Sequence, residues 1–147
     1  MSAEESAGSR IVVGVDGSAS SKQALRWAVD QARRTGAVVD AVACWAYPPL
    51  YGWGMTGLDP ELPDATGKML TQTVAEVVGD DPPVEVRESV VLGNAAEVLL
   101  ERAQGAELLV VGSRGHGGFS GALLGSVGQH CVQHAHCPVV VIRHAEN

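Results

Sequence analysis

The stretch of sequence that decides the fold is ELLVVGSRGHGGFSGALLGSVGQH, residues 107–130. It starts as a short apolar run, carries seven glycines between residues 111 and 130, and ends in a segment with helical character. Glycine is costly to order, so this density is typical of a linker, of tight turns, or of a backbone that lies close to a ligand. Because the glycines follow an apolar strand and precede a helix, they favour a ligand-binding loop.

Other apolar runs of the same kind occur along the chain. Runs rich in valine that do not alternate with polar residues are typical of strands covered on both faces, as in a parallel sheet. With 107–112, they are residues 11–16, 37–44 and 138–143. Residues 84–93 alternate at first, which predicts an edge strand.

Helical patterns separate these strands. Residues 20–35 place apolar side chains three and four apart and stop at Gly36. Asn94 with Glu97 resembles a capping box. The other predicted helices span residues 66–79, 94–105 and 126–136. Strands that alternate with helices predict an α/β fold, a doubly wound parallel sheet of five strands with helices on both faces.

Composition limits the class of partner. The formal charge of −7 argues against nucleic acid or an anionic membrane, and no apolar run is long enough to span a bilayer. Three cysteines without a CxxC pair fit a reducing compartment, so we expect a cytoplasmic protein. Residues 1–9 are predicted to be a disordered tail, and residues 10–147 a single domain.

The carboxyl ends of the central strands are the expected position of a ligand. In an open parallel sheet, ligands bind where the winding of the strands reverses. Asp16 follows the first strand, and the loop from Gly112 leads to a helix that starts near Gly125 and Ser126. Exposed N–H groups at such a helix start suit a phosphate. Asp16 has an alternative role, because aspartate before Gly-Ser is also a turn or cap signal.

Two familiar nucleotide motifs are absent from the sequence. It contains neither GxxxxGK[ST] nor a GxGxxG after the first strand. What remains is Gly112 and Gly115, nine residues, then Gly125 and Ser126. With the early segment IVVGVDGSASSKQAL, this spacing resembles the universal stress protein family, in its ATP-binding branch. The resemblance implies the strand order 3-2-1-4-5, ATP with Mg²⁺ at the strand ends, and a homodimer formed through strand 138–143.

The resemblance also implies roles for particular residues. Asp16 would lie beside the adenosine and Cys44 near the adenine edge, and the backbone N–H of Val127 would point into the site. The residues implied around the ribose and phosphates are Gly112, Gly115, Gly125 and Ser126. One departure is Gly128, where many members carry a hydroxyl.

Other polar groups in the sequence have less specific interpretations. Arg114 and His116 lie among the glycines, where a solvated side chain is the more common outcome. The irregular residues 45–65 fit either a lid or a surface loop. The segment QHCVQHAHCP suggests zinc, but its ligands would fall on a helix end and the following strand. We therefore expect no metal site in protein side chains.

Three functions remain open on the sequence. The first is a regulatory module that binds ATP, acts as a nucleotide-dependent dimer in a stress response and contacts a protein partner that the sequence does not name. The second is a slow ATP hydrolase or phosphotransferase, which lacks support because no lysine or carboxylate set accompanies the glycines. The third is a scaffold without a ligand, which the complete glycine pattern disfavours.

Overall fold

A parallel five-stranded sheet forms the centre of the protein in the computed structural model, which describes residues 9–46, 62–113 and 125–143. The strands are β1 (Arg10–Gly14), β2 (Val38–Trp45), β3 (Val86–Leu92), β4 (Leu108–Gly112) and β5 (Val139–Ile142). Their order is β3-β2-β1-β4-β5, and every pairing is parallel. The predicted fold class and strand order are confirmed, and β3 lies at an edge as predicted.

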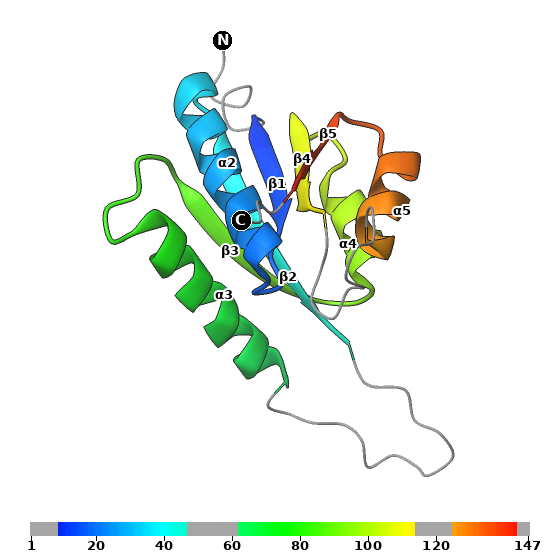
Figure 1. The fold of residues 1–147 in the computed structure, drawn as a ribbon, viewed down its shortest axis with the longest axis horizontal. Helices are drawn as coiled ribbons and strands as arrows, with labels where there is room; N and C mark the ends of the chain where they lie inside the picture. The colour runs from blue at the N-terminus through cyan, green and yellow to red at the C-terminus, as the bar shows by residue number, and fades with distance from the viewer. Residues whose placement is uncertain (1–8, 47–61, 114–124, 144–147) are drawn as a thin grey trace.

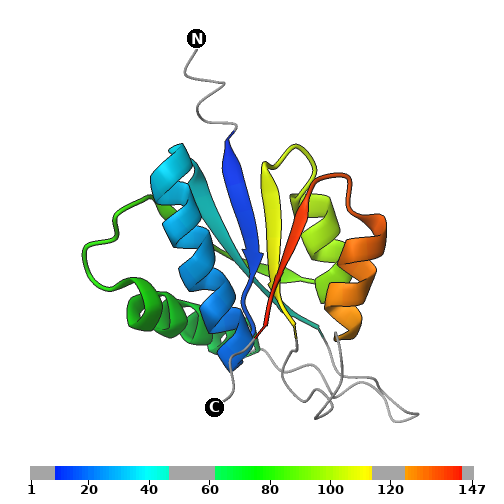
Figure 2. The same ribbon diagram turned by 45° about the horizontal axis from the view of Figure 1, so that its top comes forward.

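Helices cover both faces of this sheet. They are α2 (Ala19–Thr35), α3 (Leu62–Val78), α4 (Ala95–Arg102) and α5 (Ser126–His134). Helices α2 and α3 lie on one face, and α4 and α5 lie on the other (Figures 1 and 2). None of the helices in the described part of the chain has the length and hydropathy needed to span a membrane.

The two faces bury separate apolar clusters. Ile11 and Val13 of β1 point toward α2 and α3, where they pack with Leu25 and Leu70. Val12, between them, points to the other face and packs in the cluster that includes residues of α4 and α5. All five of these side chains are fully buried, at 0% exposure. Strands with both faces covered explain the continuous valine runs of the sequence.

The largest difference from the predicted elements concerns α3. This helix begins at Leu62 rather than at residue 66, because Pro63 falls in its first turn, where a helix needs no N–H donor. Strand β2 also continues to Trp45. The irregular stretch predicted over residues 45–65 is therefore shorter at both ends, and residues 47–61 lie outside the described part of the chain.

The amino end of β1 is tied to the end of α4. The guanidinium of Arg10 donates hydrogen bonds to the carbonyl oxygens of Arg102 at 2.7 Å and Gln104 at 2.8 Å. The last carbonyls of a helix lack intrahelical partners, and a cation there also suits the helix dipole. Arg10 therefore fixes the end of α4 against the central strand.

Candidate functional site

The carboxyl ends of the strands lie at the same edge of the sheet as the starts of two helices. Figure 2 shows the arrowheads of the strands pointing toward this edge, where α2 and α5 also begin. The edge carries Asp16 after β1, Cys44 near the end of β2, and Gly112 at the end of β4. The fold therefore brings the predicted residues from separate parts of the sequence to one edge.

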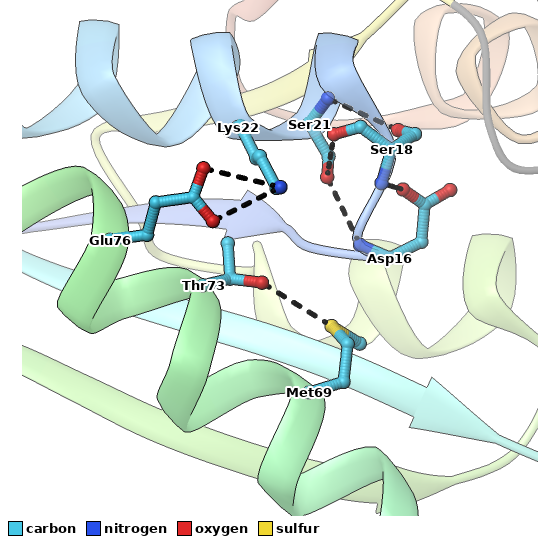
Figure 3. A network of polar contacts seen from close by, with 7 residues as sticks. All are labelled: Asp16, Ser18, Ser21, Lys22, Met69, Thr73 and Glu76. Carbon is cyan, nitrogen blue, oxygen red and sulfur yellow. Dashed lines mark hydrogen bonds and ion pairs between the residues drawn. The ribbon is translucent and has the colours of Figure 1, made fainter.

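Side chains complete the start of α2. The N–H of Ser18 donates to Oδ1 of Asp16 at 2.9 Å, and the N–H of Ser21 donates to Oγ of Ser18 at 3.2 Å (Figure 3). The hydroxyl of Ser21 in turn accepts from the N–H of Asp16 at 3.2 Å. Ser18 is thus the N-cap, while Asp16 shapes the turn before it. The turn role considered for Asp16 is present in the structure, and the carboxylate is exposed at the edge of the site.

An ion pair joins α2 to α3. Nζ of Lys22 lies 3.1 Å from Oε1 of Glu76, and the hydroxyl of Thr73 donates to Sδ of Met69 at 3.6 Å within α3 (Figure 3). Lys22 is the one lysine of α2, and it lies shortly after the turn that holds Asp16. Its ammonium group is paired with a carboxylate of α3. Lys22 therefore serves the packing of the two helices.

Gly112 has a packing role that the sequence did not reveal. A Cβ atom at this position would lie 2.8 Å from the carbonyl carbon and 2.9 Å from the Cβ of Ser20, and closer still to its Oγ. Real Cβ atoms do not approach a backbone this closely, so only glycine allows the start of α2 to pack on the end of β4. The need for glycine at residue 112 is explained by this contact without a ligand.

The start of α5 is arranged differently. Its N-cap is Gly125, which has no side chain to accept a hydrogen bond, and the N–H of Gly125 donates to the carbonyl of Ser113 at 2.7 Å. The first intrahelical bond runs from the N–H of Gln129 to the carbonyl of Gly125 at 2.9 Å. The N–H groups of the intervening residues have no partner among the described residues. These three donors belong to Ser126, Val127 and Gly128.

Cys44 lies on the α4 face of β2, half-buried. Burial raises the pKa of its thiol, and the Arg102 guanidinium opposes this shift in part. The neutral thiol is therefore the form present near neutral pH, and Cys44 acts as a small apolar surface at this edge.

A polar network that sequence reasoning missed lies further back on the same face of β2. Oδ1 of Asp40 accepts from the hydroxyl of Ser89 at 3.0 Å, and Oδ2 lies 3.6 Å from Nη1 of Arg102. The Asp40 side chain is only 11% exposed. A lone aspartate within an apolar run was the available signal, since a buried carboxylate requires partners. The network joins β2, β3 and α4.

Some predicted residues cannot be placed. Gly115, Arg114 and His116 lie outside the described residues. The structure thus describes Asp16, Cys44 and Gly112 and the helix start from Gly125 to Val127; its hydrogen bonds join that start to β4 through Ser113.

Comparison with known proteins assigns the family. The model of the universal stress protein family matches residues 9–143. The chain belongs to the universal stress protein family. The family resemblance in the sequence is thereby confirmed. A curated relative, universal stress protein Rv2623 of Mycobacterium tuberculosis, is 37% identical over 134 residues, which cover 90% of this chain and 44% of that protein. The chain therefore spans less than half the length of this relative.

Solved structures of universal stress proteins have the same fold. UspA from Lactobacillus plantarum superposes with a TM-score of 0.75 at 26% identity, covering 92% of this chain and 97% of that one. A universal stress protein in complex with cAMP gives a TM-score of 0.71 at 24% identity, covering 93% and 98%. These structures match the sheet and helices described above across nearly the whole length of each chain.

Proposed function

We propose that this universal stress protein binds an adenine nucleotide, ATP with Mg²⁺, and acts as a regulatory module in a stress response. The observation that carries the proposal is the start of α5, where three N–H donors have no partner among the described residues and the N-cap lacks a side chain. Unpaired N–H groups and the positive end of a helix dipole suit phosphate oxygens. The similar protein solved with cAMP supports an adenine nucleotide as the ligand class.

The residues around this helix start have complementary roles in the proposal. Ser126 and Val127 donate backbone N–H groups to the phosphates. The carboxylate of Asp16 accepts from the adenosine ribose, since a carboxylate oxygen accepts more than one hydrogen bond. Cys44 forms the apolar surface near the adenine, and Gly112 and Gly115 keep the loop backbone close to the ligand. Mg²⁺ is held through phosphate oxygens, which are ligands that it prefers.

The proposal is tested by calorimetry on protein freed of nucleotide, titrated with ATP, ADP, AMP and cAMP. We expect ATP to bind, and Asp16→Ala to lower its affinity at least tenfold. Asp16→Asn is the matched control, because its amide oxygen still accepts from the N–H of Ser18 and preserves the turn. If the parent protein binds none of the four nucleotides, the proposed function is wrong.

Binding without rapid turnover is part of the proposal. Hydrogen bonds that hold ground state and transition state equally lower KM without raising kcat. We therefore expect ATP hydrolysis well below ~1 s⁻¹, the low end of typical enzymes. A rate of several per second in purified protein would instead support the hydrolase or phosphotransferase, and His116→Ala would then show whether that histidine contributes.

A homodimer through β5 completes the proposed module. In the described chain β5 pairs only with β4, so its outer edge is open, and an apolar open edge favours pairing with a second copy. The carbonyls of Pro138 and Ile142 accept from β4, so the backbone of Val140 also faces β4 and that of Val141 faces outward. The nucleotide is proposed to modulate this dimer, and through it a protein partner.

The direction of these backbone groups gives a matched pair of variants for the dimer. Val141→Pro removes an outward N–H, which an edge strand tolerates, and we expect a folded monomer in sedimentation. Val140→Pro removes an N–H that faces β4, and we expect loss of stability. A Val141→Pro protein that remains dimeric would exclude this interface.

A further inference from the structure

Two histidines on the outer face of α5 lie together in a way that the nucleotide site does not use. His130 and His134 are four residues apart in the helix, both are exposed, and their ring centroids are 4.5 Å apart with an angle of 41° between the ring planes. Side chains at this spacing share one face of a helix. The pair lies toward the carboxyl end of α5, while the proposed phosphate donors lie at its amino end.

The structure separates this pair from the cysteines nearby in the sequence. Cys131 is fully buried, and burial raises the pKa of its thiol to about 11. Cys137 packs against the same apolar cluster, and burial also raises the pKa of its thiol. Both thiols therefore belong to the apolar cluster and not to the surface that carries the histidine pair. Of the residues in the segment QHCVQHAHCP that suggested zinc, the exposed candidate ligands are the three histidines, His130, His134 and His136.

The ring separation suits two ligands of one metal ion. A metal that is about 2.0–2.1 Å from a nitrogen of each ring holds the ring centres about 4.5 to 5 Å apart when the two ligands occupy adjacent positions. The observed 4.5 Å therefore requires only rotation of the rings. Helix α5 carries no lysine, arginine, aspartate or glutamate, so the helix itself places no like charge or competing ion pair beside the rings.

The geometry points to a two-histidine site on α5 for a divalent transition-metal ion such as Ni²⁺, Cu²⁺ or Zn²⁺. Imidazole nitrogen favours these ions over Mg²⁺, which prefers oxygen ligands. No group of three or more candidate ligands is found among residues 9–46, 62–113 and 125–143, and the proposed site has two protein ligands with water in the other positions. The site differs from the four-ligand zinc site that the sequence disfavoured. It is also independent of the Mg²⁺ proposed on the nucleotide.

The test is calorimetric titration of nucleotide-free, full-length protein with NiCl₂. We expect one equivalent to bind, and His130→Ala and His134→Ala each to weaken binding at least tenfold. His136→Ala is the matched control, because this histidine is exposed and lies two residues beyond the pair; its affinity should stay within twofold of the parent. Thermal midpoints in metal-free buffer should be similar for all four proteins, because the substituted side chains are exposed.

A second readout counts the nitrogen ligands directly. Cu²⁺ added at one equivalent should give an electron paramagnetic resonance spectrum with two imidazole nitrogens in the parent and in His136→Ala, and fewer in either pair variant. The inference is overturned if the parent binds no Ni²⁺, or if a pair variant binds as tightly as the parent with an unchanged copper spectrum.

Discussion

The helices α2 and α5 start at the same edge of the sheet, but their first turns differ. At α2, the carboxylate of Asp16 and the hydroxyl of Ser18 accept the N–H groups of Ser18 and Ser21. At α5, Gly125 contributes no side chain, and the following three N–H groups have no partner in the described part of the chain. One helix start therefore has a side-chain N-cap, and the other has none.

The difference shows how a chain divides stability and binding between equivalent positions. A capped helix start is worth about 1 kcal/mol to the fold. A glycine N-cap forgoes only a few tenths of a kcal/mol of that energy and keeps donors for a phosphate. Of the four predictions below, those at Gly125 and Ser18 test this division directly, and the other two concern the packing of the same two helices.

The largest expected effect comes from Gly112→Ala. The added Cβ meets the backbone of Ser20 at 2.8 Å, so α2 must move away from β4. We expect a loss of about 3 kcal/mol in the free energy of unfolding, measured by chemical denaturation. Gly14→Ala is the control, because its Cβ meets the flexible end of Leu99 at 2.9 Å and should cost less. Equal losses in both variants would contradict the packing role of Gly112.

Gly125→Asp should change stability and binding in opposite directions. The residue has φ −65° and ψ 163°, which any amino acid adopts, and a carboxylate there would cap the first turn of α5. We expect up to about 1 kcal/mol of added stability in denaturation, a few tenths from the cap and the rest from the negative charge at the helix start. We also expect at least a tenfold loss of ATP affinity in calorimetry.

Gly125→Asn separates the two causes of that loss. The asparagine caps the same N–H groups without a negative charge, so it should weaken ATP binding less than aspartate does. A Gly125→Asp protein that binds ATP as tightly as the parent would show that the α5 start is not the phosphate site.

Ser18→Ala should affect the fold and not the start of α5. It removes the acceptor for the N–H of Ser21, and we expect a loss of about 1 kcal/mol in the free energy of unfolding. Ser18→Gly should lower the free energy of unfolding by only a few tenths of a kcal/mol. The phosphate contribution to ATP binding should be retained in both, so a large loss of affinity in Ser18→Ala alone would place the ligand at α2 as well.

The effect that is smallest near neutral pH concerns the buried side of α5 and appears only in alkaline solution. The pKa of Cys131 is raised from 9.0 to about 11, so the unfolded chain releases this proton at lower pH than the folded one. The protonated thiol therefore contributes its full share to the free energy of unfolding below pH 9, and this share is lost as the pH rises from 9 to about 11. Denaturation midpoints should fall less steeply over this range in Cys131→Ala than in the parent. Parallel slopes in the two proteins would contradict this assignment.

Much of the fold could be predicted because its signals are local. Valine runs identify buried strands, and the cap at Asn94 is present as expected, with its side chain accepting from the N–H of Glu97 at 3.1 Å. Gly36 ends α2 in the left-handed conformation, at φ 82°. These features depend on neighbouring residues, which a sequence displays directly.

The site was harder to predict because its contacts join distant residues. A glycine signal does not say what fills the space beside it, and at Gly112 that space holds Ser20. The partners of Asp40 likewise come from β3 and α4. The sequence identified Asp16 and the α5 start as site residues, and these remain predictions until a nucleotide is bound.

The central position of β1 has a consequence for synthesis of the protein. Although it is the first strand of the chain, it lies between β2 and β4, and the partners of Arg10 are 92 and 94 residues away. A nascent chain can pair β1 with β2, and β2 with β3, early, but the other side of β1 stays open until β4 emerges. A ribosome stalled before that point would hold an exposed apolar strand edge, and we expect such a chain to depend on chaperones.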